Sequence, residues 1–235
     1  MSISASEEGA LPATCCLRGD NPHRLAKRGA EILRERIEKG ELLSEHNFEV
    51  SGGGKMLGVL VCRETDGDFG VLFGVSGMID GDWYPDGFVP PLFERETRDR
   101  YWYSGEGELN ALTELIDTLP KGSRRLALRR ERAEMSRKLL RLIQSTYVIV
   151  NRAGERTELD SLFPKEPPGG AGDCAGPKLI GYANLHKLEP IALTEFWIGA
   201  STKTNTRADG EYYAPCENKC APILDFMLSS GSGLS

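Results

Sequence analysis

The sequence lacks any long hydrophobic run. No segment approaches the roughly 20 consecutive apolar residues that a membrane-spanning helix needs. The first ten residues include Glu7 and Glu8 but no Lys or Arg, so they lack the positively charged start of a secretory signal peptide. These absences predict a protein with no membrane contact that resides in the cytoplasm, and an apolar fraction of 40% is enough for a buried core.

The chain also lacks an excess of positive charge. With 29 Lys and Arg against 35 Asp and Glu, its net charge of −6 gives no general attraction to the phosphates of a nucleic acid. Binding to RNA would therefore need a local basic patch. The segment 123–146 is the most basic part of the chain and predicts an amphipathic helix that includes Arg129, Arg130 and Arg137. Its basic face either lies in water, partly paired with neighbouring glutamates, or binds RNA or a partner.

The order of strand and helix patterns predicts an α/β fold. Two β-rich runs, 55–62 and 69–76, flank an Asp-Gly pair, which is a good signal for a β-hairpin. Other segments with a regular pattern are helices at 21–41, 106–118, 123–146 and about 176–185, and strands at 147–150 and 191–198. We expect the hairpin and these two strands to form one mixed β-sheet flanked by helices.

The two ends of the chain differ from the middle in composition. Residues 1–20 are small and polar without apolar periodicity, which predicts a disordered N-terminus. The Ser- and Gly-rich residues 229–235 predict a flexible tail. Between them we expect a single α/β domain at 21–228, interrupted by a helical insertion at about 100–146.

Six cysteines without a secretory signal argue against a disulfide scaffold and favour buried thiols or metal ligands. Cys174 follows the glycine-rich loop 164–172 at the start of a helix, and Cys216 and Cys220 are four residues apart. This spacing suits a tetrahedral zinc, for which three protein ligands leave one position for water. Three possibilities stay open: a structural zinc, a reactive metal centre, or buried thiols without a metal.

The pattern around these cysteines is similar to that of cytidine-deaminase-like enzymes. Those enzymes carry a metal-binding His or Cys on a helix, a catalytic Glu two residues later, and a Pro-Cys-x-x-Cys turn that opens another helix. This chain has Asp-Cys-Ala-Gly at 173–176 and Pro-Cys-Glu-Asn-Lys-Cys at 215–220. The resemblance implies a deaminase-like fold. Gly176 stands where the catalytic Glu is expected and the cysteine pair has one extra residue, so catalysis needs Glu195 or Asp173 instead.

Glu195 lies in an otherwise apolar strand, where a carboxylate is costly to bury unless it is paired or neutralised. The alternation of a strand places it on the same face as Leu193 and Trp197. On the enzyme hypothesis it therefore faces a base-binding pocket formed with Trp197, Tyr212 and Tyr213. The alternative is an edge strand whose Glu points to solvent or pairs with a lysine.

Five runs of the sequence resemble, in the same order, the long N-terminal region of some bacterial RluA-type pseudouridine synthases. They lie at 54–61, 88–93, 167–179, 195–199 and 215–224, and the Pro-Pro-Gly-x-Ala-Gly-Asp-Cys segment is the most distinctive. The resemblance spans roughly residues 20–228 and implies an RNA-modification setting, with RNA or a pseudouridine synthase domain as partner. In that family an Arg-Leu-Asp motif supplies the essential aspartate of the isomerase domain. This sequence contains no Arg-Leu-Asp, so the resemblance does not imply isomerase activity.

Two functions follow from these patterns. The first is a zinc-binding module associated with RNA modification. The second is a zinc-dependent deaminase-like enzyme that acts on a nucleobase, nucleoside or nucleic acid, with a carboxylate to transfer protons. They differ in whether a carboxylate lies close to the metal position, because a general acid or base must reach the proton that it moves.

Overall fold

A five-stranded antiparallel sheet forms the centre of the protein. The computed structural model describes residues 2–3, 21–63, 69–202, 204 and 206–231, so most of the predicted disordered N-terminus and residues 232–235 of the predicted tail lie outside it. The strands, in their order across the sheet, are β1 (Ser2–Ile3), β3 (Phe69–Val75), β2 (Lys55–Arg63), β6 (Glu189–Ile198) and β7 (Tyr212–Tyr213). The predicted α/β class is confirmed, and every pairing in this sheet is antiparallel rather than mixed.

The predicted hairpin is the pair β2 and β3, with Leu60 opposite Leu72. Strand β2 lies between β3 and β6, and its residues from Leu57 to Cys62 are buried. Burial on both faces explains why β2 reads as a nearly continuous apolar run instead of an alternating one.

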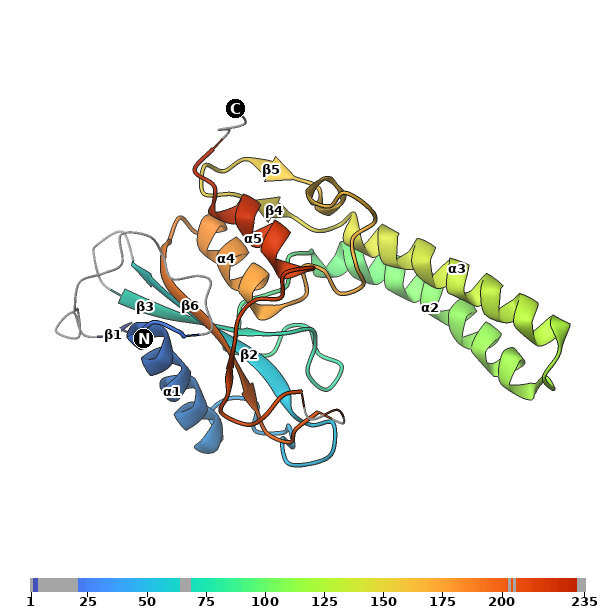
Figure 1. The fold of residues 1–235 in the computed structure, drawn as a ribbon, viewed down its shortest axis with the longest axis horizontal. Helices are drawn as coiled ribbons and strands as arrows, with labels where there is room; N and C mark the ends of the chain where they lie inside the picture. Colours follow the sequence, from blue (N-terminus) through green and yellow to red (C-terminus); the bar gives the residue numbers. More distant parts are fainter. Residues whose placement is uncertain (1, 4–20, 64–68, 203, 205, 232–235) are drawn as a thin grey trace.

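Helices cover both faces of the sheet (Figure 1). Helix α1 (Arg24–Glu38) packs Leu25, Ala30 and Leu33 against one face, while α4 (Ala175–Leu185) and α5 (Cys220–Leu228) lie over the other. Helix α4 lies almost directly on the backbone of the hairpin. A Cβ atom at Gly58 would be 2.6 Å from the Ala175 Cβ, and one at Gly74 would be 2.9 Å from the Leu179 Cγ. Two glycines in facing strands therefore set the height of α4 above the sheet.

Two long antiparallel helices project from this body (Figure 1). They are α2 (Arg95–Thr118) and α3 (Ser123–Gln144), and they occupy the segment that we expected to be a helical insertion at about 100–146. In the described part of the chain, no helix combines the length and the apolar character that crossing a membrane requires.

The prediction that the strand at 147–150 belongs to the main sheet was wrong. Strand β4 (Ile149–Val150) pairs with β5 (Arg156–Thr157) in a separate two-stranded sheet, followed by the 3-10 helix η2 (Leu159–Leu162). The Val150 carbonyl accepts a hydrogen bond of 2.8 Å from the Asn184 side chain of α4. This segment therefore packs on the outer side of α4, which separates it from the main sheet.

Candidate metal centre

Three cysteine thiols from two distant segments meet beside the N-terminus of α4. Cys174 is the N-cap residue of α4, Cys220 opens α5, and Cys216 precedes it by four residues. The three sulfurs lie within 4.8 Å of one another, and those of Cys216 and Cys220 are 3.4 Å apart. The predicted clustering of the three thiols is therefore confirmed.

The glycine-rich loop delivers Cys174 to this position. Gly172 has a φ of +87°, and a Cβ atom there would lie 2.7 Å from the Tyr147 ring. Only glycine can therefore occupy this position, where the backbone of the loop contacts the ring. The following residues are tied to the end of β3: the Gly77 N–H donates to the Asp173 carbonyl at 2.8 Å, and the Ala175 N–H donates to the Ser76 hydroxyl at 3.0 Å.

The chemistry of the three donors fits a zinc ion. Thiolates are common zinc ligands, and a Zn–S distance near 2.3 Å requires sulfurs roughly 3.8 Å apart in a tetrahedral site. The hydrogen bond between Cys174 and Cys220 lowers the pKa of the Cys174 thiol and raises that of the Cys220 thiol. Cys216 is exposed whereas Cys220 is buried, so the centre opens to solvent on the side of Cys216.

Glu195 points from β6 towards the first turn of α4. Its side chain is buried, with 5% of the residue exposed, and its Oε1 accepts a hydrogen bond of 2.9 Å from the Gly176 N–H. Burial raises the pKa of this carboxyl, and the Gly176 N–H partly opposes the shift. The Glu195 charge opposes the lowering of the Cys174 pKa and adds to the raising of the Cys220 pKa. Its hydrogen-bond partner Gly176 lies two residues after Cys174 in the chain. The alternative of an edge-strand Glu in solvent is excluded, because β6 is an interior strand.

Asp173, the second predicted proton carrier, is held by a different partner. Its Oδ1 accepts a hydrogen bond of 2.5 Å from the Tyr147 hydroxyl, and burial raises its pKa. The buried Lys178 lies in the first turn of α4 and donates to the Val75 and Gly77 carbonyls at 2.9 and 2.7 Å. Asp173 is thus anchored by Tyr147, and Glu195 is the carboxylate whose only hydrogen bonds in the described residues are to backbone N–H groups of α4.

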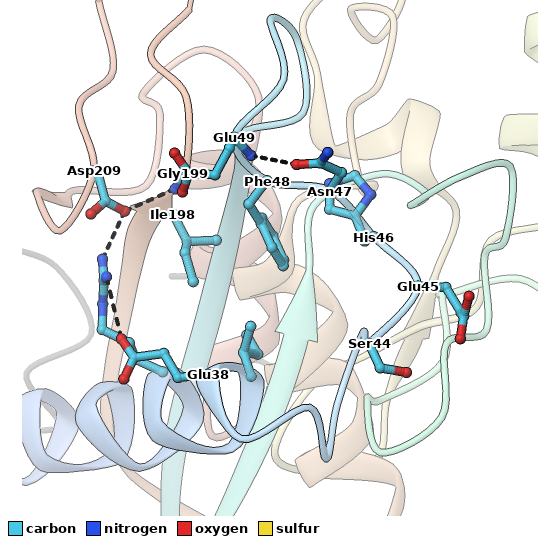
Figure 2. Close-up of a pocket in the computed structure, with 12 residues that line it drawn as sticks. Glu38, Ser44, Glu45, His46, Asn47, Phe48, Glu49, Ile198, Gly199 and Asp209 are labelled. Atoms are coloured by element: carbon cyan, nitrogen blue, oxygen red, sulfur yellow. Dashed lines mark hydrogen bonds and ion pairs between the residues drawn. The ribbon is translucent and has the colours of Figure 1, made fainter.

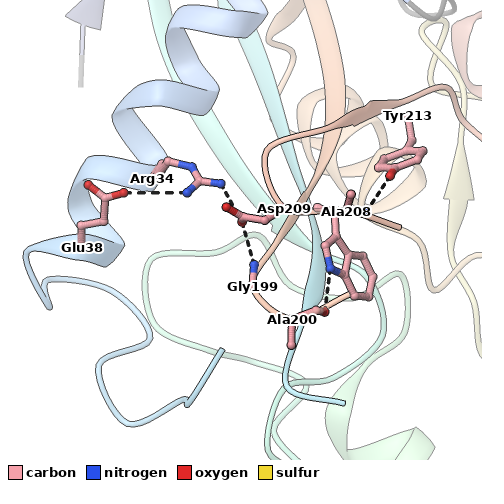
Figure 3. A network of polar contacts seen from close by, with 8 residues as sticks. Arg34, Glu38, Gly199, Ala200, Ala208, Asp209 and Tyr213 are labelled. Carbon is pink, nitrogen blue, oxygen red and sulfur yellow. Dashed lines mark hydrogen bonds and ion pairs between the residues drawn. The ribbon is translucent and has the colours of Figure 1, made fainter. Parts of the chain in front are cut away.

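The predicted pocket aromatics divide between the two faces of the sheet. Tyr213 lies opposite Glu195 in the β6–β7 register, so both side chains share one face. The Tyr213 hydroxyl accepts from the Ala208 N–H at 2.9 Å (Figure 3). Tyr212 lies on the other face, where its ring packs against Phe196 on the α1 side. Tyr212 therefore does not belong to the surroundings of the cysteines.

Trp197 lies farther along the face that carries Glu195. Its Nε1 donates to the Ala200 carbonyl at 3.0 Å, and its ring covers Gly54, where a Cβ atom would be 2.6 Å from the Trp197 Cζ2. These contacts fix the indole at the end of β6, and none of them joins it to the cysteines.

The predicted RNA-binding arginines lie on α3, which projects from the body that carries α4 and α5 (Figure 1). Arg129, Arg130 and Arg137 are all exposed, and in the described part of the chain none of them forms an ion pair. The structure therefore leaves this basic surface free but does not bring it to the metal centre.

A cavity that no sequence motif marks lies on the α1 side of the sheet (Figure 2). It measures about 490 Å³, and Arg34, His46 and Asp209 are among its lining residues. The Arg34 guanidinium contacts the Asp209 carboxylate at 2.8 Å, and that carboxylate also accepts from the Gly199 N–H (Figure 3). The His46 ring is fixed by the Asp80 carboxylate at 2.7 Å and the Gly53 carbonyl at 2.6 Å. These groups come from three separate segments, which is why sequence spacing did not reveal them.

No protein-family model matches this sequence, and no curated protein or solved structure shows significant similarity to it.

Proposed function

We propose that this protein is a zinc-dependent, deaminase-like hydrolase that acts on a nucleobase, either free, in a nucleoside or in RNA. The observation that carries the proposal is the buried Glu195 carboxylate, bound to the first turn of the helix whose N-cap residue is Cys174. A purely structural zinc does not need a buried carboxylate beside its ligands, and burying one is costly. Hydrolysis does need such a group, because a proton must be moved close to the metal.

Each group has a distinct part in this proposal. The zinc would be held by Cys174, Cys216 and Cys220, and three protein ligands would leave its fourth position for water. As a Lewis acid, the zinc would lower the pKa of that water. Removal of an amino group by water transfers a proton from the water to the departing ammonia. Glu195 can carry that proton, because burial raises its pKa above that of an ordinary carboxyl group, which makes it a better proton acceptor.

The departure from the deaminase pattern supports this role for Glu195. Gly176 stands where the pattern has its catalytic Glu, and a Cβ atom at Gly176 would lie 3.7 Å from the Glu195 Oε1. The carboxylate thus comes from the facing strand and reaches the region where the side chain of a Glu at position 176 would begin. A glycine at 176 leaves room for it.

The test is a deamination screen with the zinc-loaded full chain, using nucleobases, nucleosides and single-stranded RNA. We expect turnover of at least one of these classes, and a loss of about 100-fold or more in Glu195→Gln. Zinc content and melting temperature should stay unchanged, since glutamine keeps the shape of the side chain. Glu189→Gln is the matched control, because Glu189 lies on the same strand but is exposed. Activity that survives Glu195→Gln, or no activity in any class, would count against the proposal.

An RNA-modification setting is the second candidate, and the exposed arginines of α3 favour it. Helix α3 carries eight Lys and Arg against two Asp and Glu, which allows phosphate contacts despite the negative net charge of the chain. Reversing the charge of Arg129, Arg130 and Arg137 together should abolish salt-sensitive RNA binding. The same reversal at Arg24, Lys39 and Lys187, which are also exposed, should weaken it far less. Equal losses in the two variants would remove α3 as the contact surface.

A further inference from the structure

The projecting helical hairpin has an apolar groove along one side. The groove has a volume of about 340 Å³, and its lining includes Leu109, Met135 and Leu142 together with Glu108 and Lys138. Leu142 is 47% exposed, although a leucine so close to a helix seam is usually covered. The groove therefore presents apolar side chains to solvent between the two helices.

Beyond the groove, partly and fully exposed apolar side chains continue towards the tip of the hairpin, and we call this line the stripe. Leu128, Met135 and Leu142 follow one another at intervals of seven residues, which places them on one side of α3. Leu115 follows Glu108 at the same interval on α2 and is 41% exposed. Of the seven exposed large hydrophobic residues in the described chain, four lie in α2 or α3, and two of these, Leu115 and Leu142, lie on the stripe.

We infer that this stripe is the docking surface for the hairpin of a second copy of the chain, so that two hairpins form a four-helix bundle. The 24 residues of α2 make a rod roughly 36 Å long. Two such helices side by side are about 18 Å wide, which gives a face of roughly 650 Å² on each copy. The total of about 1,300 Å² lies within the range of stable, specific interfaces.

The charges of the groove favour a second copy over an unrelated partner. Glu108 and Lys138 line the same groove from opposite helices, and the only ion pair of Lys138 in the described chain is with Glu134 on its own helix. A two-fold axis parallel to the two helices keeps the position of every residue along the hairpin axis the same in both copies. It therefore brings Glu108 of each copy opposite Lys138 of the other, and the face is complementary to itself.

This arrangement leaves the basic surface of α3 outside the interface. Arg130 and Arg137 lie two residues beyond Leu128 and Met135, which turns them about 200° around the helix from the stripe. The inference is thus independent of the proposed metal chemistry, and it does not compete with an RNA contact through these arginines.

Sedimentation equilibrium of the full chain tests the inference. We expect wild-type protein to dimerise in the micromolar range. The double variant Leu115→Glu with Leu142→Glu should weaken association at least about 100-fold, because charged side chains would have to be buried. Leu126→Glu is the matched control, since Leu126 is 56% exposed but lies two residues away from the stripe. Circular dichroism melting checks that all variants fold.

A charge-exchange experiment separates contacts between copies from contacts within one chain. Glu108→Lys alone and Lys138→Glu alone should each associate poorly, because like charges meet in their homodimers. Mixed in equal amounts, the two variants should associate about 10-fold more tightly than either does alone, since opposite charges then meet at both places. A monomeric wild type at about 200 µM, association only with added RNA, equal loss in Leu126→Glu, or no gain on mixing would overturn the inference.

Discussion

Gly58→Ala perturbs the contact that positions Cys174. The added methyl group would lie 2.6 Å from the Ala175 Cβ and 2.9 Å from the Leu179 Cδ1, whereas ordinary contacts between carbon atoms are about 3.5–4.0 Å. Helix α4 must therefore move away from β2 by roughly 1 Å. Because Cys174 is the N-cap residue of α4, this movement also displaces its thiol from those of Cys216 and Cys220.

The expected cost follows from two opposing effects. Overpacking a close-packed core lowers the free energy of unfolding by about 1–3 kcal/mol, whereas replacing glycine by alanine in a strand raises it by about 0.5–1 kcal/mol. We expect the free energy of unfolding to fall by about 1–2 kcal/mol and the zinc affinity to fall about 10-fold, as for the loss of other groups that support metal ligands. Urea denaturation and competition with a chelator measure the two quantities.

Gly107→Ala is the matched control for this prediction. Gly107 lies in α2, and a Cβ atom there would meet nothing within 4 Å. The same substitution should therefore raise the free energy of unfolding by about 0.5–1 kcal/mol and leave the zinc affinity unchanged. If Gly58→Ala were as stable as Gly107→Ala and bound zinc equally well, the close contact of α4 with the sheet would not position Cys174.

Three further predictions concern stability. Burial lowers the pKa of Lys178 to about 8, so the unfolded chain binds more protons between about pH 8 and 10.5 and the folded state gains stability as the pH rises. The gain should reach roughly 3 kcal/mol, and urea denaturation over this range should show it in the wild type but not in Lys178→Met. Tyr147→Phe removes the hydrogen bond to Asp173 and should cost about 1.5–3 kcal/mol in urea denaturation, whereas an unchanged midpoint would mean that water replaces the hydroxyl. Leu33→Ala should cost about 2–5 kcal/mol by the same measurement, because this side chain has no exposed surface between α1 and the sheet, and a cost below about 1 kcal/mol would contradict that packing.

The sequence predicted the elements whose side chains follow a simple period. The hairpin of β2 and β3, the helices α1 and α4 and the strand β6 lie within two or three residues of their predicted bounds. The predicted sheet face of the Glu195 side chain is also correct, because strand alternation places it on the face opposite to that of Phe196. The convergence of the cysteines could be predicted because Cys216 and Cys220 are four residues apart, a spacing that suits metal ligands, and Cys174 follows a glycine-rich loop.

Other features depend on contacts that sequence spacing does not encode. Helix α2 begins at Arg95, whereas the predicted helix begins at residue 106. The sequence pattern missed its first turns because the buried side chain there belongs to an arginine. The Arg98 guanidinium packs against the rings of Trp83 and Trp102. A charged residue therefore interrupts the apolar periodicity of the sequence, although the helix is packed at this position. Tyr212 was assigned to the wrong side because β7 has only two residues, and its register is set by pairing with β6.

The zinc content of the purified full chain, determined by elemental mass spectrometry, tests the central claim most directly. We predict about one zinc per chain in the wild type, and less than about 0.1 in Cys174→Ser, because removal of one thiol leaves two ligands. Cys62→Ala, a change at a cysteine in β2 outside the cluster, should retain the full zinc content. A wild-type protein without zinc, or a Cys174→Ser variant that keeps it, would contradict the metal centre and the proposed chemistry.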